Sequence, residues 1–265
     1  MNNLLKGKKG IIFGALDENS IAWKVALKAK EQGAEFVLSN APVALRLGKI
    51  NELAELCDTT VIAADATSIE DLENLFDQAT EKYGKLDFIL HSIGMSPNVR
   101  KNKAYTELNY DWFLKTLDIS ALSFHKVLQV AYQKDALNEW SSVVALTYVA
   151  AQRTFPGYND MAEAKATLES IARSFGYHYG TKKNVRVNTI SQSPTMTTAG
   201  SGVKGFDVFY DYANKLSPLG NASSDSCADF TIALFSDLSR MVTMQNLFHD
   251  GGFSSIGMTE AFMGE

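Results

Sequence analysis

The sequence predicts an α/β fold built on one doubly wound parallel sheet of about seven strands. Two observations indicate this: short apolar runs rich in β-branched residues alternate with longer segments of helical period, and the alternation continues nearly to the end of the chain. Parallel neighbours need crossover connections, and right-handed crossovers stack helices on both faces of the sheet. No break marks a second domain, so we expect residues 1–265 to form a single domain.

Seven runs are expected to be strands: Gly10–Gly14, Glu35–Ser39, Thr60–Ala64, Leu86–His91, Ser142–Leu146, Val185–Ile190 and Leu247–Asp250. Between them, Ile21, Val25 and Ala29 mark one helical stripe, and Ser68 followed by Asp71 opens another helix in the style of a capping box. Two stretches, near 96–109 and 194–209, interrupt the pattern after strand ends. Sheets of this kind bind ligands there, so both are candidate substrate loops.

Composition narrows the class of protein. The chain is 46% hydrophobic and 21% charged, with a net charge of −5 and no block of Lys or Arg, which argues against nucleic acid or an anionic membrane as main partner. Its apolar runs are far shorter than the roughly 18 residues of a membrane span, and Met1–Lys9 lacks a signal-peptide core, so we expect a cytoplasmic protein.

Cys57 and Cys227 are expected to be free, buried thiols. No metal is expected, because no ligand spacing relates the four histidines, His91, His125, His178 and His249.

The first strand turns at Gly14 and enters a helix near Ser20, but the dinucleotide fingerprint G-x-G-x-x-G is absent. A glycine permits the sharp turn, Ser20 can cap the helix, and the N–H groups of the first helical turn can hold a pyrophosphate. Taken alone, this stretch is better interpreted as an ordinary strand-to-helix turn.

Two other strand ends favour a dinucleotide cofactor. Asp65 closes the third strand and could accept from an adenine amino group, and Gly94 follows the fourth strand and leaves room for a ribose. The carboxyl ends of the first, third and fourth strands would then outline one crevice, as in a Rossmann-like domain. The second strand ends without the acidic residue typical of NADH sites and without an Arg pair for a 2′-phosphate. We expect NADH, with NADPH left open, and interpret Arg46 as a solvated helix residue.

A lysine lies on a helix face that should be apolar. Thr147 and Tyr148 follow the fifth strand, and Pro156-Gly157 is a turn signal. Lys165 then shares the helical face formed by Leu168, Ile171, Ala172, Phe175 and Tyr179. Lysine is almost never fully buried unless it is paired, so Lys165 either extends to the surface or contacts something specific in a cleft.

Tyr158 stands seven residues before Lys165, which on a helix is two turns, or roughly 10.5 Å of rise, on nearly the same side. Both side chains could therefore face one ligand, and a nearby ammonium is expected to lower the pKa of the Tyr158 phenol. The alternative is that Tyr158 packs and Lys165 extends to solvent.

These residues resemble a known family. "SIA" at Ser20–Ala22, "HSIG" at His91–Gly94, Tyr148, Tyr158 with six residues before Lys165, and motifs that continue to "DGGF" at Asp250–Phe253 resemble the enoyl-acyl-carrier-protein reductases of bacterial-type (type II) fatty acid synthesis, within the short-chain dehydrogenase/reductase superfamily. The six-residue spacing is the most specific element, because ordinary members of the superfamily place three residues there. The resemblance covers the chain from Lys6 to Met258.

The resemblance implies hydride transfer from NADH or NADPH to C3 of a trans-2-enoyl thioester on acyl carrier protein. It implies that Tyr158 stabilises the enolate oxygen, that Lys165 binds the nicotinamide ribose, and that Tyr148 lines the pocket and assists Tyr158. It assigns further cofactor contacts to Ser20, Ile21, Asp65, Ala66, Ile93, Gly94, Thr195, Thr197 and Thr198, with Gly14 at the turn. It assigns the acyl pocket to Met95, Ser96 and Met161, and it suggests a homotetramer.

The sequence also departs from the family. Gln192-Ser193-Pro194 replaces the frequent Ala-Gly-Pro after the sixth strand, and Gly200, Gly202 and Gly205 are expected to hinge a lid. Arg100 and Lys204 could meet an acidic carrier protein, although solvated cations are the simpler interpretation. Two alternatives remain open: a carbonyl reductase acting on 3-oxoacyl or other ketones, and a non-catalytic NAD(H)-binding regulator.

Overall fold

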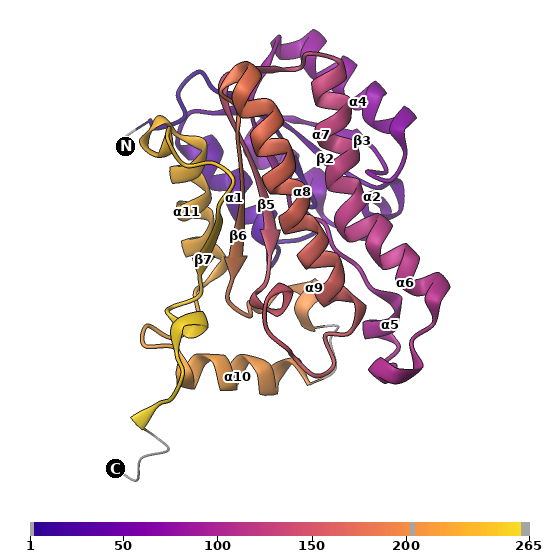
Figure 1. Ribbon diagram of the computed structural model, residues 1–265. Coiled ribbons are helices and arrows are strands. Elements are labelled where there is room, and N and C mark those ends of the chain that lie inside the picture. Colours follow the sequence, from indigo (N-terminus) through magenta and orange to yellow (C-terminus); the bar gives the residue numbers. More distant parts are fainter. Residues whose placement is uncertain (1–2, 202–204, 261–265) are drawn as a thin grey trace.

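A single sheet of seven parallel strands organises the molecule (Figure 1). The computed structural model describes residues 3–201 and 205–260. The strand order is β3-β2-β1-β4-β5-β6-β7, which confirms the predicted fold class. The strands are β1 (Lys9–Phe13), β2 (Glu35–Asn40), β3 (Thr60–Ala63), β4 (Leu86–His91), β5 (Leu137–Thr147), β6 (Arg186–Gln192) and β7 (Asn246–His249).

The fifth strand begins at Leu137, well before the predicted Ser142. Its pairing with β4 shifts register between the Leu86–Leu137 and Phe88–Ser142 pairs, and Trp140 has a φ of 64°. An irregular, largely polar stretch of this kind carries no alternating apolar signal, so the sequence pattern marked only the regular part of the strand.

Helices connect the strands throughout. The α-helices are α1 (Ile21–Glu31), α2 (Pro42–Leu47), α3 (Ile50–Cys57), α4 (Ile69–Tyr83), α5 (Pro97–Arg100), α6 (Tyr110–Leu117), α7 (Ser123–Gln133), α8 (Asp160–Lys183), α9 (Thr198–Ser201), α10 (Phe206–Leu216) and α11 (Ser224–Phe235). Short 3-10 turns are η1 (Tyr105–Glu107), η3 (Val149–Ala151), η4 (Asp237–Ser239) and η5 (Phe253–Ser255), and η2 (Asp118–Leu122) is a π-helical turn.

Two hydrophobic clusters fill the space between the sheet and its helices. On one face, α4, α7 and α8 bury side chains such as Leu75, Phe124 and Leu168 against the sheet. On the other face, α1, α3 and α11 do the same with side chains such as Val25 and Leu53. Each large aliphatic side chain buried in this way contributes roughly 1.5–3 kcal/mol. The sheet is therefore the fixed frame on which loops at its carboxyl edge are placed.

The strand order reverses between β1 and β4, where the chain turns first to β2 and β3 and later to β5, β6 and β7. Loops leaving β1 and β4 diverge there, which opens a crevice at the carboxyl ends of these strands. Gly14 follows β1 with a φ of +94°, and a Cβ on it would lie 2.0 Å from the carbonyl oxygen of Ser92. Only glycine fits a backbone that approaches so closely.

The two predicted caps have different outcomes. Ser68 accepts a hydrogen bond from the Asp71 amide at 3.2 Å, which confirms the predicted cap of α4. Ser20 occupies the N-cap position of α1, but the predicted cap bond is wrong, because its hydroxyl donates to the Asp17 carbonyl at 2.7 Å and accepts from the Leu16 amide at 3.3 Å. Ser20 thus shapes the loop before α1 and makes no side-chain cap bond to the helix.

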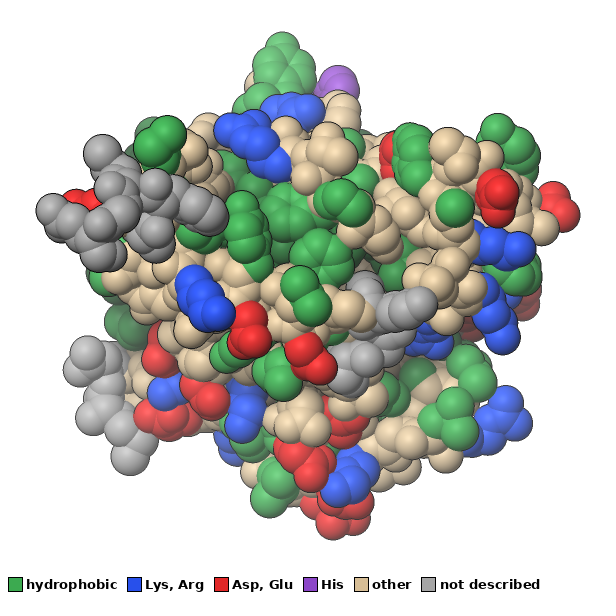
Figure 2. All heavy atoms as spheres, turned by 90° about the horizontal axis from the view of Figure 1, so that it is seen from below, with side chains coloured by type: hydrophobic (Ala, Val, Ile, Leu, Met, Phe, Trp, Pro, Cys, Tyr) green, Lys and Arg blue, Asp and Glu red, His purple; other side chains and the backbone are tan. Residues whose placement is uncertain are grey.

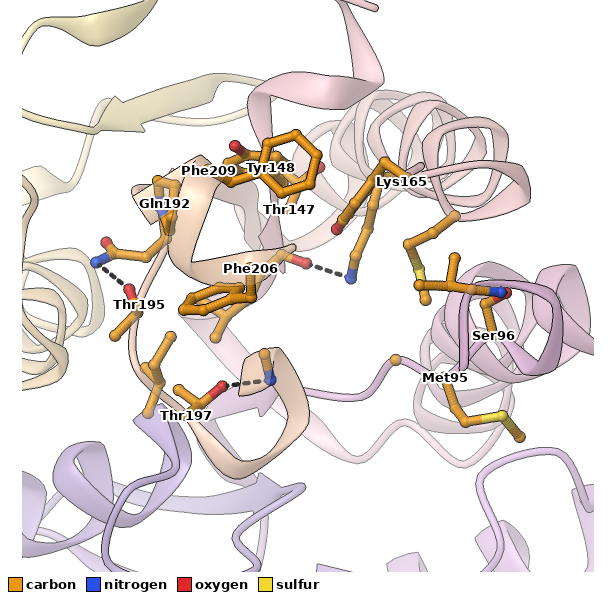
Figure 3. Close-up of a pocket in the computed structure, with 18 of the residues that line it drawn as sticks. Met95, Ser96, Thr147, Tyr148, Lys165, Gln192, Thr195, Thr197, Phe206 and Phe209 are labelled. Carbon is orange, nitrogen blue, oxygen red and sulfur yellow. Dashed lines mark hydrogen bonds between the residues drawn. The ribbon is translucent and has the colours of Figure 1, made fainter. Parts of the chain in front are cut away.

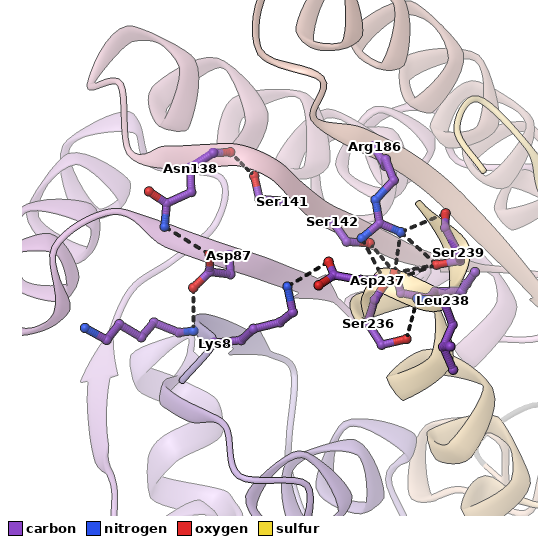
Figure 4. A network of polar contacts seen from close by, with 12 residues as sticks. Lys8, Asp87, Asn138, Ser141, Ser142, Arg186, Ser236, Asp237, Leu238 and Ser239 are labelled. Carbon is purple, nitrogen blue, oxygen red and sulfur yellow. Dashed lines mark hydrogen bonds and ion pairs between the residues drawn. The ribbon is translucent and has the colours of Figure 1, made fainter. Parts of the chain in front are cut away.

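A buried arginine fastens the opposite end of the sheet (Figure 4). Arg186, at the amino end of β6, donates to the carbonyls of Leu234, at 2.8 Å, and Ser236, at 3.2 Å, and to Ser239. Its guanidinium thereby satisfies carbonyls at the carboxyl end of α11, where orphan acceptors and the helix dipole favour a cation. This network holds α11 against the sheet, far along the strands from the crevice.

Cys57 and Cys227 are free and buried, as predicted. Burial raises the pKa of the Cys57 thiol to about 11 and that of Cys227 to about 12, so both are protonated and unreactive at neutral pH. Within residues 3–201 and 205–260, no helix is long and apolar enough to cross a membrane.

Candidate active site

A cavity of about 280 Å³ opens at the carboxyl ends of β4, β5 and β6. Figure 2 views this end of the molecule, and hydrophobic side chains gather near the centre of the face. Eleven of the predicted site residues line the cavity: Ile21, Ile93, Gly94, Met95, Ser96, Tyr148, Tyr158, Met161, Lys165, Thr195 and Thr197. The sequence therefore located the walls of one cavity from segments far apart in the chain.

The other predicted cofactor residues lie outside this cavity. They are Gly14 and Ser20 in the first turn, Asp65 and Ala66 after β3, and Thr198 in α9. Oδ1 of Asp65 accepts from the amide and hydroxyl of Thr67, at 2.9 and 2.8 Å. The hydroxyl of Thr198 donates to Oδ2 of Asp17 at 2.6 Å, so α9 reaches the first turn. These positions follow the carboxyl ends of β1, β3 and β6, along the crevice predicted for the dinucleotide.

Lys165 is buried in the cavity wall, with only 8% of its surface exposed. Its Nζ donates to the Leu146 carbonyl at the end of β5, at 2.9 Å, and the bond is drawn in Figure 3. Burial lowers the pKa of Lys165 to about 8, while the negative charge of Glu169 acts in the opposite direction. The alternative in which this lysine extends to solvent is therefore wrong. The other interpretation, that Lys165 makes a specific contact within a cleft, is confirmed.

Tyr158 lines the same cavity but does not stand on the helix. It precedes α8, which begins at Asp160, and Asn159 between them has a φ of 45°. A residue with positive φ breaks the helical path, so the predicted two-turn separation from Lys165 is wrong in its geometry, although both residues face one cavity. The predicted lowering of the phenol pKa is also wrong: burial raises the pKa of Tyr158 above its ordinary value.

Tyr148 extends from the end of β5 and forms an aromatic wall. Its ring centroid lies 5.2 Å from that of Tyr158 and 5.3 Å from that of Phe155. Burial is the main cause that raises the pKa of Tyr148, and Tyr158 and Asp250 act in the same direction. Both tyrosines are consequently neutral hydrogen-bond donors at neutral pH.

A buried carboxylate behind Lys165 was missed by sequence reasoning. Glu169, one turn further along α8, is 4% exposed. It accepts from the Thr147 hydroxyl and from the Gln152 amide, each at 2.9 Å. Its negative charge raises the pKa of Lys165 against the effect of burial. An acidic residue four positions after the anomalous lysine was the available signal, since such pairs are neighbours on a helix.

The loop after β6 is anchored at its base by Gln192, the residue at which the sequence departs from the family. The Gln192 amide donates to the Thr195 hydroxyl at 3.1 Å, and its oxygen lies 2.7 Å from Nδ1 of His249 on β7. Figure 3 shows Phe206 and Phe209 in the cavity wall; both lie within the predicted loop near 194–209 but were not named as site residues. The predicted hinge at Gly202 and the predicted contact at Lys204 lie outside the described residues.

A doubly wound sheet, with a buried lysine and two tyrosines at the crevice, defines a nucleotide-dependent oxidoreductase of the short-chain dehydrogenase/reductase class. A family model described as "Enoyl-(Acyl carrier protein) reductase" matches residues 14–254. The chain belongs to this family.

Individual relatives cover nearly the whole chain. It is 33% identical to "Enoyl-[acyl-carrier-protein] reductase [NADH] 2" of Rhizobium meliloti over 97% of this chain and 96% of the relative. It is 31% identical to the NADH enoyl reductase FabI of Bacillus subtilis over 96% of this chain and 98% of the relative. Among solved structures, the FabI–NADH complex from Alistipes finegoldii superposes with a TM-score of 0.96 and 66% identity, covering 97% of this chain and 92% of that one.

Proposed function

We propose that the protein reduces the trans-2 double bond of an enoyl thioester carried on acyl carrier protein, with NADH as hydride donor. The observation that carries the proposal is the convergence of Tyr148, Tyr158 and Lys165 on one largely apolar cavity in a chain of this family. An apolar cavity suits an acyl chain, and a small number of polar groups within it suits recognition of one carbonyl.

The residues present fit a dinucleotide. A Cβ on Gly94 would stand 3.5 Å from the Lys165 amine, and both residues line the cavity, so the absence of a side chain at Gly94 leaves room beside the lysine. Lys165 would donate to the nicotinamide ribose hydroxyls, Ile93 and Gly94 would flank the ring, and Asp65 and Ala66 would receive the adenine. Thr195, Thr197 and Thr198 would contact the nicotinamide and phosphate groups, and Ser20 and Ile21 would border the pyrophosphate. When bound, NADH supplies the hydride that C3 of the enoyl group accepts.

Negative charge then develops on the thioester oxygen as the enolate forms. Tyr158 would donate a hydrogen bond to this oxygen, which is an interaction that strengthens as charge appears. Because burial raises its pKa, the phenol keeps its proton at neutral pH and acts as a donor. Tyr148, whose ring packs beside Tyr158, would orient that phenol, while Met95, Ser96 and Met161 would hold the acyl chain.

The proposal extends to the loops around the cavity and to the assembly of the protein. The segments near 96–109 and 194–209 act as substrate loops, supported by Ser96, Arg100, Phe206 and Phe209 in the cavity wall. The protein works as a homotetramer in the cytoplasm, as the resemblance suggests. Light scattering checks the assembly.

The test is absorbance at the band of reduced nicotinamide, with crotonyl thioester as substrate and each cofactor in turn. We expect turnover with NADH and little with NADPH, and none with a 3-oxoacyl thioester. Tyr158→Phe should lower kcat by about 10²-fold or more while the Kd for NADH stays within about twofold, because the hydroxyl acts on the substrate oxygen. Tyr177→Phe, at an exposed tyrosine on α8, is the matched control. Equal turnover in wild type and Tyr158→Phe would contradict the proposed role.

A further inference from the structure

A second buried carboxylate lies beside the cavity and is not explained by the chemistry above. Asp160 is the first residue of α8, and its side chain has no exposed surface. It follows Tyr158 by two residues and precedes Met161, and both of these line the cavity. The carboxylate itself does not line it.

Three side chains from another part of the chain donate to Asp160. The Ser96 hydroxyl lies 2.6 Å from Oδ1, and the Asn98 amide and the Thr116 hydroxyl each lie 2.8 Å from Oδ2. All three donors are buried, and they come from the residue before α5, from α5 itself and from α6. Asp160 therefore joins the start of α8 to both of these helices.

The contacts compensate for a charge removed from water. Among residues 3–201 and 205–260, no ion pair includes Asp160. Its charge is instead balanced by three neutral donors and by the amino end of the 24-residue helix α8. Hydrogen bonds to a carboxylate are short and strong, so loss of any donor leaves a poorly solvated charge. The carboxylate thus favours one position of α5 relative to α8.

The same donors shape the cavity wall. Ser96 lines the cavity, and its hydroxyl also accepts from the Val99 amide at 3.0 Å, which caps the short helix α5. Asn98 holds Asn109 through two bonds of 3.0 Å, one to its carbonyl and one from its amide, and so closes the loop between α5 and α6. The stretch near 96–109 is therefore held at both ends by groups that meet at Asp160.

We propose that Asp160 is a positioning residue that clamps α5 and the loop to Asn109 against α8 and thereby fixes the wall that receives the acyl chain. The proposal deepens the enoyl reductase function and rests on it for the nature of the substrate. Asp160 acts through Ser96 and Val99, which line the cavity, whereas its own carboxylate does not line it.

The test is Asp160→Asn in the full-length protein. Asparagine keeps the size of the side chain but turns one acceptor oxygen into a donor that faces Ser96, or Asn98 and Thr116. With trans-2-octenoyl thioester we expect KM to rise about tenfold, kcat to stay within about twofold and the Kd for NADH to be unchanged. The rise should be smaller with crotonyl thioester, whose short chain reaches less of the wall. Amide hydrogen exchange in residues 97–103 should accelerate by about tenfold or more, because clamped amides are protected.

Two further variants separate positioning from general destabilisation. Thr116→Val removes one donor at a residue outside the cavity, and we expect a smaller rise in KM, which is not additive with that of Asp160→Asn. Thr231→Val is the control, since this fully buried hydroxyl donates to the Cys227 carbonyl on α11, across the sheet. It should lower Tm without changing KM or exchange in residues 97–103.

The proposal is overturned if Asp160→Asn leaves KM and exchange in residues 97–103 at wild-type values, or if Thr231→Val at equal loss of Tm raises KM as much. If Asp160→Asn does not fold, the same two readouts on Thr116→Val decide the matter. If the wild-type protein reduces no enoyl thioester, the proposed function fails, whereas the exchange comparison still decides whether Asp160 clamps α5.

Discussion

Replacing Lys165 by methionine should stabilise the protein without cofactor, because the buried ammonium opposes folding. The pKa of this lysine falls from an ordinary 10.5 to about 8, and burial is the main cause. Each pKa unit corresponds to about 1.4 kcal/mol, so the folded state bears a penalty of about 3 kcal/mol when the lysine is charged. Methionine removes that penalty but also loses the hydrogen bond to the Leu146 carbonyl, worth about 1 kcal/mol. The net expected gain at pH 7 is about 2 kcal/mol.

The stability gained by Lys165→Met should depend on pH in a defined direction. Below pH 8 the lysine is protonated in both folded and unfolded chains, so the penalty is complete and constant. Between pH 8 and 10.5 the unfolded chain holds a proton that the folded one has released, so wild-type stability rises with pH relative to the variant. The advantage of Lys165→Met should therefore be largest below pH 8 and shrink as the pH approaches 10.5.

The assay is urea unfolding of both proteins without NADH, at pH 7 and at pH 9.5. Lys126→Met is the matched control, because that lysine donates to Thr67 and Asp118 at the surface and should lose stability when replaced. A Lys165→Met variant that is less stable than wild type at pH 7, or whose advantage grows with pH, would refute the reasoning.

The remaining predictions concern the turn after β1 and the charge behind Lys165. Gly14→Ala should cost about 2 kcal/mol more in unfolding free energy than Gly84→Ala, since both glycines have positive φ but only Gly14 faces a carbonyl, that of Ser92. Urea titration of the two variants measures their unfolding free energies. Equal losses in the two variants would mean that the close approach of the Ser92 carbonyl to Gly14 does not matter for stability. Glu169→Gln should lower the pKa of Lys165 further below 8, because the carboxylate raises it. The pH above which NADH binding weakens should then be lower in the variant than in the wild type. If this pH is unchanged, the charge of Glu169 does not act on Lys165.

The pattern of neighbouring residues was sufficient to predict the sheet and the helices that pack on it. Strands and helices were predicted because alternation and the 3.6-residue period are properties of neighbouring residues. The place of Lys165 on an apolar helix face identified it as anomalous and left two outcomes, extension to solvent or contact in a cleft, of which the structure has the second. Tyr158 was assigned the wrong local geometry, although the preceding Pro156-Gly157 turn, with Gly157 at a φ of 86°, indicated that the helix had not yet begun.

Contacts between distant segments could not be predicted. Asp160 meets its donors across 44 to 64 residues of chain, and Glu169 meets Thr147 across 22. Nothing in the sequence near a carboxylate says whether it will be exposed on a helix or enclosed by other helices. Resemblance to a family transferred the named residues of the shared motifs, whereas Asp160 is one of the six unspecified positions between Tyr158 and Lys165.

The strand order has a consequence for how the chain folds. β1 lies between β2 and β4, and the cavity draws its walls from residues as early as Ile21 and as late as Phe209. Pairings of such high sequence separation form slowly in folding, so the cavity is complete only when the chain as far as Phe209 is in place. A molecule bound across both halves of the sheet stabilises the whole fold, by about 2.7 kcal/mol at a hundred times its Kd. Cellular cofactor concentration would thereby affect how long the protein survives as well as how fast it works.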